Sequence, residues 1–225
     1  MIQAFKNTAI SLGKALINII IPPFCQACRT FLEEDQIFCE PCMERIQPIA
    51  TYQLEVTPTL RCNVWAISDY KEPLKSLLLA KTFSNIVAAR QLGHLMWHMT
   101  VVNQNPVDVI VPIPLHWQRE AKRGYNQAYE MAHVLAQYKQ VPCSKLLKRV
   151  AKTQYQAHVS FQERQHNVKN VFTLTRLDPS NYHNKHILLV DDLMTSGSTL
   201  KEAVKVLARL KPASISIVVA CRVAR

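Results

Sequence analysis

The chain of 225 residues is long enough for one ordinary domain and a small additional unit. A hydrophobic content of 48% is that of a globular protein, and only four glycines argue against flexible linkers. The formal net charge of +11 is concentrated between residues 116 and 170. This favours phosphate-bearing partners, either a small substrate or nucleic acid, and a solvated basic face is the alternative.

The first segment, residues 4–20, has the pattern of an amphipathic helix that ends before Pro22 and Pro23. Such a helix can lie on a membrane surface or dock on the rest of the protein, and docking is the favoured interpretation. No run of 18 apolar residues occurs, so no transmembrane segment is expected.

Two Cys-x-x-Cys pairs follow, with ten residues between them: Cys25, Cys28, Cys39 and Cys42. The odd total of seven cysteines excludes a complete set of intramolecular disulfides, and the paired spacing favours a metal in a reducing cytoplasm. Four thiolates complete a tetrahedral shell for structural Zn²⁺; two unrelated thiol pairs are the alternative. Four apolar residues between the pairs are expected to pack around the metal: Phe31, Leu32, Ile37 and Phe38.

The next segments predict a linker at 49–58, a strand at 59–70, a short helix from Pro73 to about Lys81, and a longer helix at 83–102. His94 and His98 lie one helical turn apart on the longer helix. Because no third ligand is evident, we interpret them as surface or partly buried side chains rather than metal ligands.

The second half alternates strands with helices. Residues 108–115 predict a strand that runs into a proline-containing tip, and Asn126 is expected to cap the following helix. The basic stretch 148–172 fits no buried element and is interpreted as an excursion or hairpin lid. Residues 214–220 are expected to close the sheet. This alternation indicates a parallel α/β sheet with its site at the carboxyl ends of the strands.

The most informative stretch is 187–200. Residues 187–190 predict a short buried strand, and Asp191 and Asp192 follow directly. A turn of small residues, 195–199, then precedes a helix with apolar spacing. Backbone N–H groups and the positive end of that helix favour an anion, while the two carboxylates suit sugar hydroxyls or Mg²⁺.

This pattern resembles the phosphoribosyl-diphosphate (PRPP) signature of type I phosphoribosyltransferases, in which two acidic residues and two spacers precede Thr-(Thr/Ser)-Gly-x-Thr. An ordinary strand–helix unit with a capped helix is the alternative. The whole chain is similar to the competence protein F (ComF) family. The residues that carry this similarity are 111–116, Arg119, 123–127, Arg149, Thr153, Gln156, Arg164, Asn167, Val168 and Phe172, together with the paired cysteines. Two departures are that only Cys62 stands near a further cysteine pair of the family, and that Asn170 replaces a glycine.

The resemblance implies an α/β, type I phosphoribosyltransferase fold, a parallel sheet flanked by helices, behind an N-terminal four-cysteine zinc-finger-like unit. The expected division is a helix at 1–24, a zinc unit and linker at 25–58, and a phosphoribosyltransferase-like domain at 59–225. The expected cofactors are Mg²⁺ with PRPP and structural Zn²⁺.

The resemblance also implies roles for individual residues. Asp191 and Asp192 would contact the ribose hydroxyls with the help of Mg²⁺, and together with Arg123 they are the expected catalytic residues. The expected PRPP-binding residues are Thr195, Ser196, Gly197, Ser198, Thr199, Pro112, Ile113, Pro114, Arg119 and Arg164. Enzymes of the 6-oxopurine type carry a carboxylate at the position of Thr195, which makes hypoxanthine or guanine a less favoured acceptor.

Three functions fit the sequence. The first is a Mg²⁺-dependent phosphoribosyltransferase with an unknown acceptor, and the second is a PRPP or nucleotide sensor without turnover. The third is a single-stranded DNA-binding protein that works with competence or DNA-processing proteins once DNA has reached the cytoplasm. The sequence lacks the dense aromatic–basic interleaving that is typical of base-stacking platforms.

Overall fold

The structure is a computed structural model that describes residues 24–33, 36–80, 86–150, 171–176 and 178–224. The helix expected at 4–20 lies outside these residues. So does the central part of the 148–172 stretch, including Arg164. For Arg119 the backbone is described but the side chain is not.

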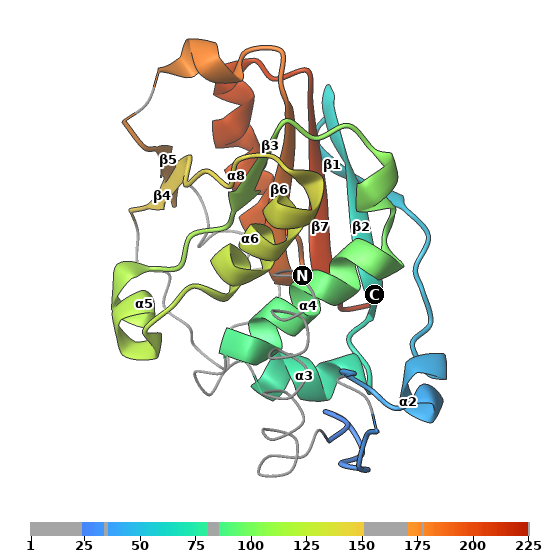
Figure 1. The fold of residues 1–225 in the computed structure, drawn as a ribbon. Coiled ribbons are helices and arrows are strands. Elements are labelled where there is room, and N and C mark those ends of the chain that lie inside the picture. Colours follow the sequence, from blue (N-terminus) through green and yellow to red (C-terminus); the bar gives the residue numbers. More distant parts are fainter. Residues whose placement is uncertain (1–23, 34–35, 81–85, 151–170, 177, 225) are drawn as a thin grey trace, which may run out of the picture.

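A five-stranded sheet in the order β1-β2-β7-β6-β3 forms the centre of the molecule (Figure 1). Its strands are β1 (Tyr52–Thr57), β2 (Leu60–Asp69), β7 (Ser214–Arg222), β6 (His186–Met194) and β3 (Val109–Pro112). All neighbours pair in parallel except β1, which is antiparallel to β2. The predicted α/β class is therefore confirmed. The four parallel strands have their carboxyl ends on the same side of the sheet. The last strand, β7, does not close the sheet at an edge; it lies between β2 and β6.

β1 corrects the expected linker at 49–58. It pairs with β2 from Tyr52 opposite Val64 to Thr57 opposite Leu60, with a register shift after Glu55. Of its six residues only Val56 is buried, so the strand lacks the apolar run that would have revealed it. Such an edge strand is stabilised by its partner more than by its own composition.

One face of the sheet is covered by the helices α3 (Leu74–Ala80), α4 (Ile86–Met99) and α6 (Gln127–Lys139). α4 is shorter than the predicted helix at 83–102 and continues into a 3-10 turn, Val101–Gln104. α4 and α6 approach so closely that a Cβ on Gly93 would lie 2.9 Å from Cβ of Val134.

The other face of the sheet packs against α8 (Ser198–Leu207) and a two-stranded sheet, β4 (Leu147–Arg149) with β5 (Phe172–Leu174). These two short strands flank the basic stretch that the sequence presented as an excursion. Among the described residues, no helix combines the length and the apolar character needed to cross a membrane.

The cysteine-containing unit is joined to the main core. Leu32, Phe38 and Ile46 are buried in the same cluster as Trp65 of β2 and Leu74 of α3. The expectation that apolar residues between the cysteine pairs pack inward holds for Leu32, Phe38 and the partly buried Ile37. Phe31 instead is exposed and contacts Phe24 edge to face, with ring centroids 6.2 Å apart.

Candidate functional site

The end of β6 carries the two predicted carboxylates. The strand does not stop at Val190 as expected but runs through Asp191 and Asp192 to Met194. The reason is that β7 continues the parallel ladder beside it, with Asp191 opposite Val219 and Met194 opposite Arg222. Both carboxylates are half-buried, and the Asp191 Oδ1 atom accepts a hydrogen bond of 2.9 Å from the Asp192 amide.

The small-residue turn depends on Gly197. Its φ of 74° lies in the left-handed region, which glycine adopts without steric cost. A Cβ at this position would also lie 3.3 Å from Leu54 Cδ1 of β1. Helix α8 begins at Ser198, and the first N–H groups of a helix have no partner within it. The hydroxyl oxygens of Ser196 and Ser198 lie 2.9 Å apart beside this helix start, and a helix N-terminus suits a phosphate.

The tip after β3 is fixed against β6 and α6. The Ile113 amide donates to the carbonyl of Val190 at 2.9 Å, and the carbonyl of Ile113 accepts from Asn126 Nδ2 at 3.0 Å. Asn126 also caps α6 as predicted, because its Oδ1 accepts from the Ala128 amide at 3.0 Å. The side chains of Pro112 and Ile113 are buried, the Ile113 amide is already bonded to Val190, and Pro112 and Pro114 have no N–H, so this tip has no backbone donor left for an anion.

The structure therefore brings three predicted groups to the ends of neighbouring strands: the two carboxylates, the 195–199 turn and the 112–114 tip. Arg123 is the last residue of α5 (Trp117–Arg123), which lies to the left of the sheet in Figure 1. The side chain of Arg119 and all of Arg164 fall outside the described part of the chain.

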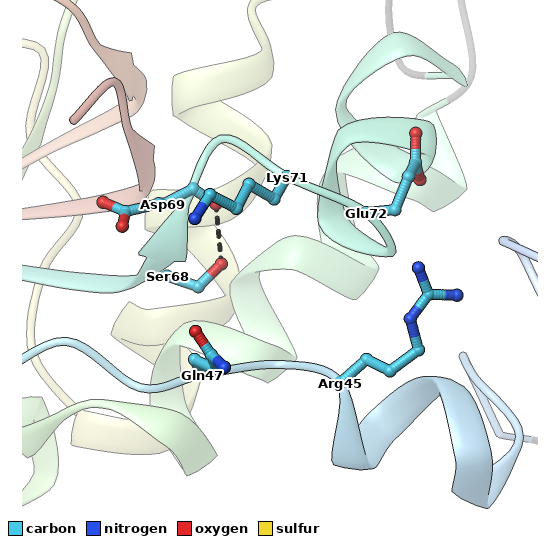
Figure 2. A pocket seen from close by; sticks show the side chains of 6 residues that line it. All are labelled: Arg45, Gln47, Ser68, Asp69, Lys71 and Glu72. Carbon is cyan, nitrogen blue, oxygen red and sulfur yellow. Dashed lines mark hydrogen bonds between the residues drawn. The ribbon is translucent and has the colours of Figure 1, made fainter.

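A polar pocket of about 400 Å³ lies where β2 ends at the same edge of the sheet. Figure 2 shows its lining residues: Arg45, Gln47, Ser68, Asp69, Lys71 and Glu72. Asp69 pairs with Arg222 of β7, with 3.0 Å between Oδ1 and Nε. Sequence reasoning missed this pair because its two residues are 153 positions apart.

The four predicted metal ligands form a cluster. The Sγ atoms of Cys25, Cys28, Cys39 and Cys42 all lie within 4.8 Å of one another. A tetrahedral ion with bonds of about 2.3 Å holds its sulfur atoms roughly 3.8 Å apart, so the cluster can hold one metal ion. The first pair lies in a turn and the second at the start of α2 (Glu40–Glu44).

The thiols of the cluster differ in their environment. Burial raises the pKa of Cys42 to about 12. A hydrogen bond with Thr30, 3.2 Å from Sγ to Oγ1, lowers the pKa of Cys28 to about 6. Burial also raises the pKa of Cys62 and of Cys143, which lie outside the cluster, to about 11.

Comparison with known proteins shows to which family the domain that contains this site belongs. The phosphoribosyl transferase domain family matches residues 94–225, which include both carboxylates, the turn and the tip. Competence protein F of Haemophilus influenzae is 29% identical over 203 residues, covering 87% of this chain and 82% of the relative. DNA utilization protein YhgH of Salmonella typhimurium is 32% identical over 168 residues, covering 70% of each chain. The chain belongs to the ComF family of phosphoribosyl transferase domain proteins.

The ComF assignment extends beyond the matched domain. An alignment over 87% of the chain must include residues before position 94, the part that contains the cysteine unit and the β1–β2 hairpin. Competence protein ComFC of Bacillus subtilis is 32% identical over 109 residues, covering 48% of this chain and 42% of the relative.

The double role of Asn126 gives a test of how the tip is held. Asn126→Asp keeps the oxygen that caps α6 but replaces the donor to the Ile113 carbonyl with a second oxygen. We expect this nearly isosteric change to lower the free energy of unfolding by about 1–3 kcal/mol. The reason is that the buried carbonyl of Ile113 loses its donor and faces a second oxygen instead. Urea denaturation measures it. The control is Gln137→Glu at an exposed position of α6, which should change stability by less than about 0.5 kcal/mol. Equal effects of the two substitutions would contradict an anchoring role for Asn126.

Proposed function

We propose that this protein binds PRPP with Mg²⁺ at residues 187–200 and transfers its phosphoribosyl group to an acceptor. The observation that supports this most directly is the unit formed by β6, its two carboxylates, the Gly197 turn and the start of α8, inside the matched family domain. Its place at the carboxyl ends of parallel strands is where α/β sheets bind ligands.

In this proposal each predicted group has a role. The backbone amides of 195–199 and the hydroxyls of Thr195, Ser196 and Thr199 hold the 5′-phosphate. Asp191 and Asp192 accept hydrogen bonds from the ribose hydroxyls, and bound Mg²⁺ offsets phosphate charge. Arg119, Arg123 and Arg164 face the pyrophosphate, and the 112–114 tip forms the wall of the site beside it.

The proposed reaction is a displacement at the anomeric carbon of PRPP. A nucleophilic atom of the acceptor forms a bond to that carbon while the bond from the carbon to the pyrophosphate oxygen breaks. The electron pair leaves with pyrophosphate, and the acceptor gives up its proton to solvent water. Positive charge develops on the sugar and negative charge on the leaving group, so orientation and electrostatic stabilisation provide the catalysis.

The residue at position 195 restricts which bases can act as the acceptor. The exposed hydroxyl of Thr195 stands where enzymes for 6-oxopurines are expected to carry a carboxylate, and a hydroxyl cannot act as a base at neutral pH. We therefore propose an acceptor other than hypoxanthine or guanine. PRPP or nucleotide sensing without turnover is the alternative use of the same site.

The names of the relatives suggest a cellular setting. They refer to competence and to DNA utilization. We propose that this protein acts in the cytoplasm during natural competence, after DNA uptake, in association with DNA-processing proteins.

The carboxylates give the first test of the proposal. Asp191→Asn with Asp192→Asn should weaken PRPP–Mg²⁺ binding and lower pyrophosphate release by about 100-fold or more, since each lost charged hydrogen bond is worth about 1.5–3 kcal/mol. Calorimetry and a coupled pyrophosphate assay with a panel of bases measure both. Wild-type binding without release on any base would favour sensing. No PRPP binding would refute the site, and release stimulated by guanine would refute the excluded acceptor.

We further propose that the cysteine cluster holds structural Zn²⁺. All four ligands are protein thiols, which leaves no open position for water and is typical of a structural site. Purified protein should contain about one Zn per chain. Cys28→Ser should reduce that content to near zero, whereas Cys143→Ser, outside the cluster, should leave it unchanged. Native protein without zinc, or full zinc in the Cys28→Ser protein, would contradict the proposal.

A second function, binding of single-stranded DNA, is supported by a groove of about 1130 Å³ between the cysteine unit and α4. Tyr138 of α6 lines it and stacks on Trp97, with ring centroids 5.0 Å apart. His94 and His98 lie edge-on to the same Tyr138 ring. Burial and the charge of His98 lower the pKa of His94, which favours its neutral ring at pH 7. In this proposal the Tyr138 ring stacks with a base, and Arg90 of the same groove contacts a phosphate.

DNA binding through this groove should depend on Tyr138. Tyr138→Ala should weaken binding of a labelled oligothymidine by about tenfold, because one base–aromatic stack is worth roughly 1–3 kcal/mol. Trp117→Ala removes an exposed ring outside the groove and serves as the matched control. Affinity should also fall as salt rises. Equal losses in the two variants, or affinity independent of salt, would contradict this interface.

A further inference from the structure

Arg222, at the end of β7, connects three segments that are distant in sequence. Its guanidinium forms the ion pair with Asp69 of β2 and lies over the ring of Tyr52, 5.0 Å from the ring centroid. Its carbonyl accepts a hydrogen bond of 2.7 Å from the Tyr70 amide. The sheet register places Asp69, Arg222 and Met194 in one row across three neighbouring strands.

Tyr52, at the start of β1, carries this connection to the phosphate turn. Its hydroxyl donates to Met194 Sδ at 3.0 Å, across 142 positions of sequence. Met194 is the last residue of β6 and is 8% exposed. Its Sδ lies 3.6 Å from the point where a Cβ on Gly197 would be, and Leu54 of the same β1 strand lies 3.3 Å from that point. The first residues of β1 thus pack directly under the turn that begins α8.

We propose that Tyr52 and Arg222 are positioning residues that hold the 195–199 turn in its phosphate-binding conformation through Met194. This inference rests on the proposed function of the turn. Neither residue belongs to the predicted signature, and both act through Met194 rather than by touching the ligand.

The exposure of these groups indicates positioning rather than stability. The side chains of Arg222 and Asp69 are 30% and 26% exposed, and ion pairs in contact with water contribute little to folding. Tyr52 is half-buried, and loss of its hydroxyl leaves the ring in place beneath Arg222. Loss of the Tyr52 hydroxyl would remove the restraint on Met194, and therefore the restraint on the residues that follow Met194.

The test uses the full-length protein and two readouts. Tyr52→Phe should raise the hydrogen-exchange rates of the Lys201 and Val223 amides, which donate to the carbonyls of Gly197 and Met194, about fivefold, a factor typical of one lost hydrogen bond, while the unfolding midpoint falls by no more than about 2–4 °C. PRPP–Mg²⁺ affinity should fall by a similar factor. Met194→Leu removes the acceptor but keeps an apolar side chain, so adding Tyr52→Phe to it should have no further effect.

Arg222→Met should raise the same exchange rates, and Arg222→Lys, which keeps the cation but lacks the planar guanidinium over Tyr52, should raise them less. The matched control is Arg61→Met, which breaks the 3.4 Å pair with Glu55 on the same hairpin without a contact to the turn. Exchange at Lys201 and Val223 that is unchanged in Tyr52→Phe, or raised equally in Arg61→Met, would overturn the inference. Raised exchange in a protein whose wild type does not bind PRPP would support the inference and refute the proposed function.

Discussion

The position of β6 between β7 and β3 is the constraint on which the candidate site depends. β6 pairs in parallel with both neighbours, so two ladders fix where its carboxyl end lies. Successive side chains of a strand point to opposite faces of the sheet. A shift of the pairing by one residue would therefore move Asp191 and Asp192 each to the face opposite its present one. The hydrogen bond from Ile113 to Val190 ties the tip to the same register. One pattern of backbone pairing thus places the carboxylates, the turn and the tip together.

Much of this arrangement could be predicted because its signals are local. The apolar runs in β3 and β6 are buried on both faces of a parallel sheet and therefore read as continuous hydrophobic stretches. The turn could be predicted because glycine adopts a left-handed conformation without steric cost, and Gly197 stands among small residues directly before a helix. The four cysteines were recognised by spacing alone, since two adjacent turns bring their thiols to one point.

The features that were missed are those made by contacts between distant residues. β1 is a half-exposed edge strand whose stability comes from β2, and its own residues resemble a loop. Tyr52 and Met194 lie on strands that are 142 positions apart in sequence and separated in the sheet by β2 and β7, so no local pattern indicates their contact. The aromatic groove was missed for the same reason: Trp97 and Tyr138 belong to different helices, so no interleaving is visible along the chain.

β1 also explains how the cysteine unit can matter to a site outside it. The chain leaves the shared core at Ile46 and enters β1 at Tyr52, six positions later, beneath Arg222. An edge strand with one partner is weak alone, so it depends on what holds its two ends. The turn into β2 holds one end, and the packing of Ile46 beside Cys42 and Trp65 holds the other. A metal ion that orders the cysteines would then fix the start of β1, and through Tyr52 and Met194 its effect would reach the phosphate turn.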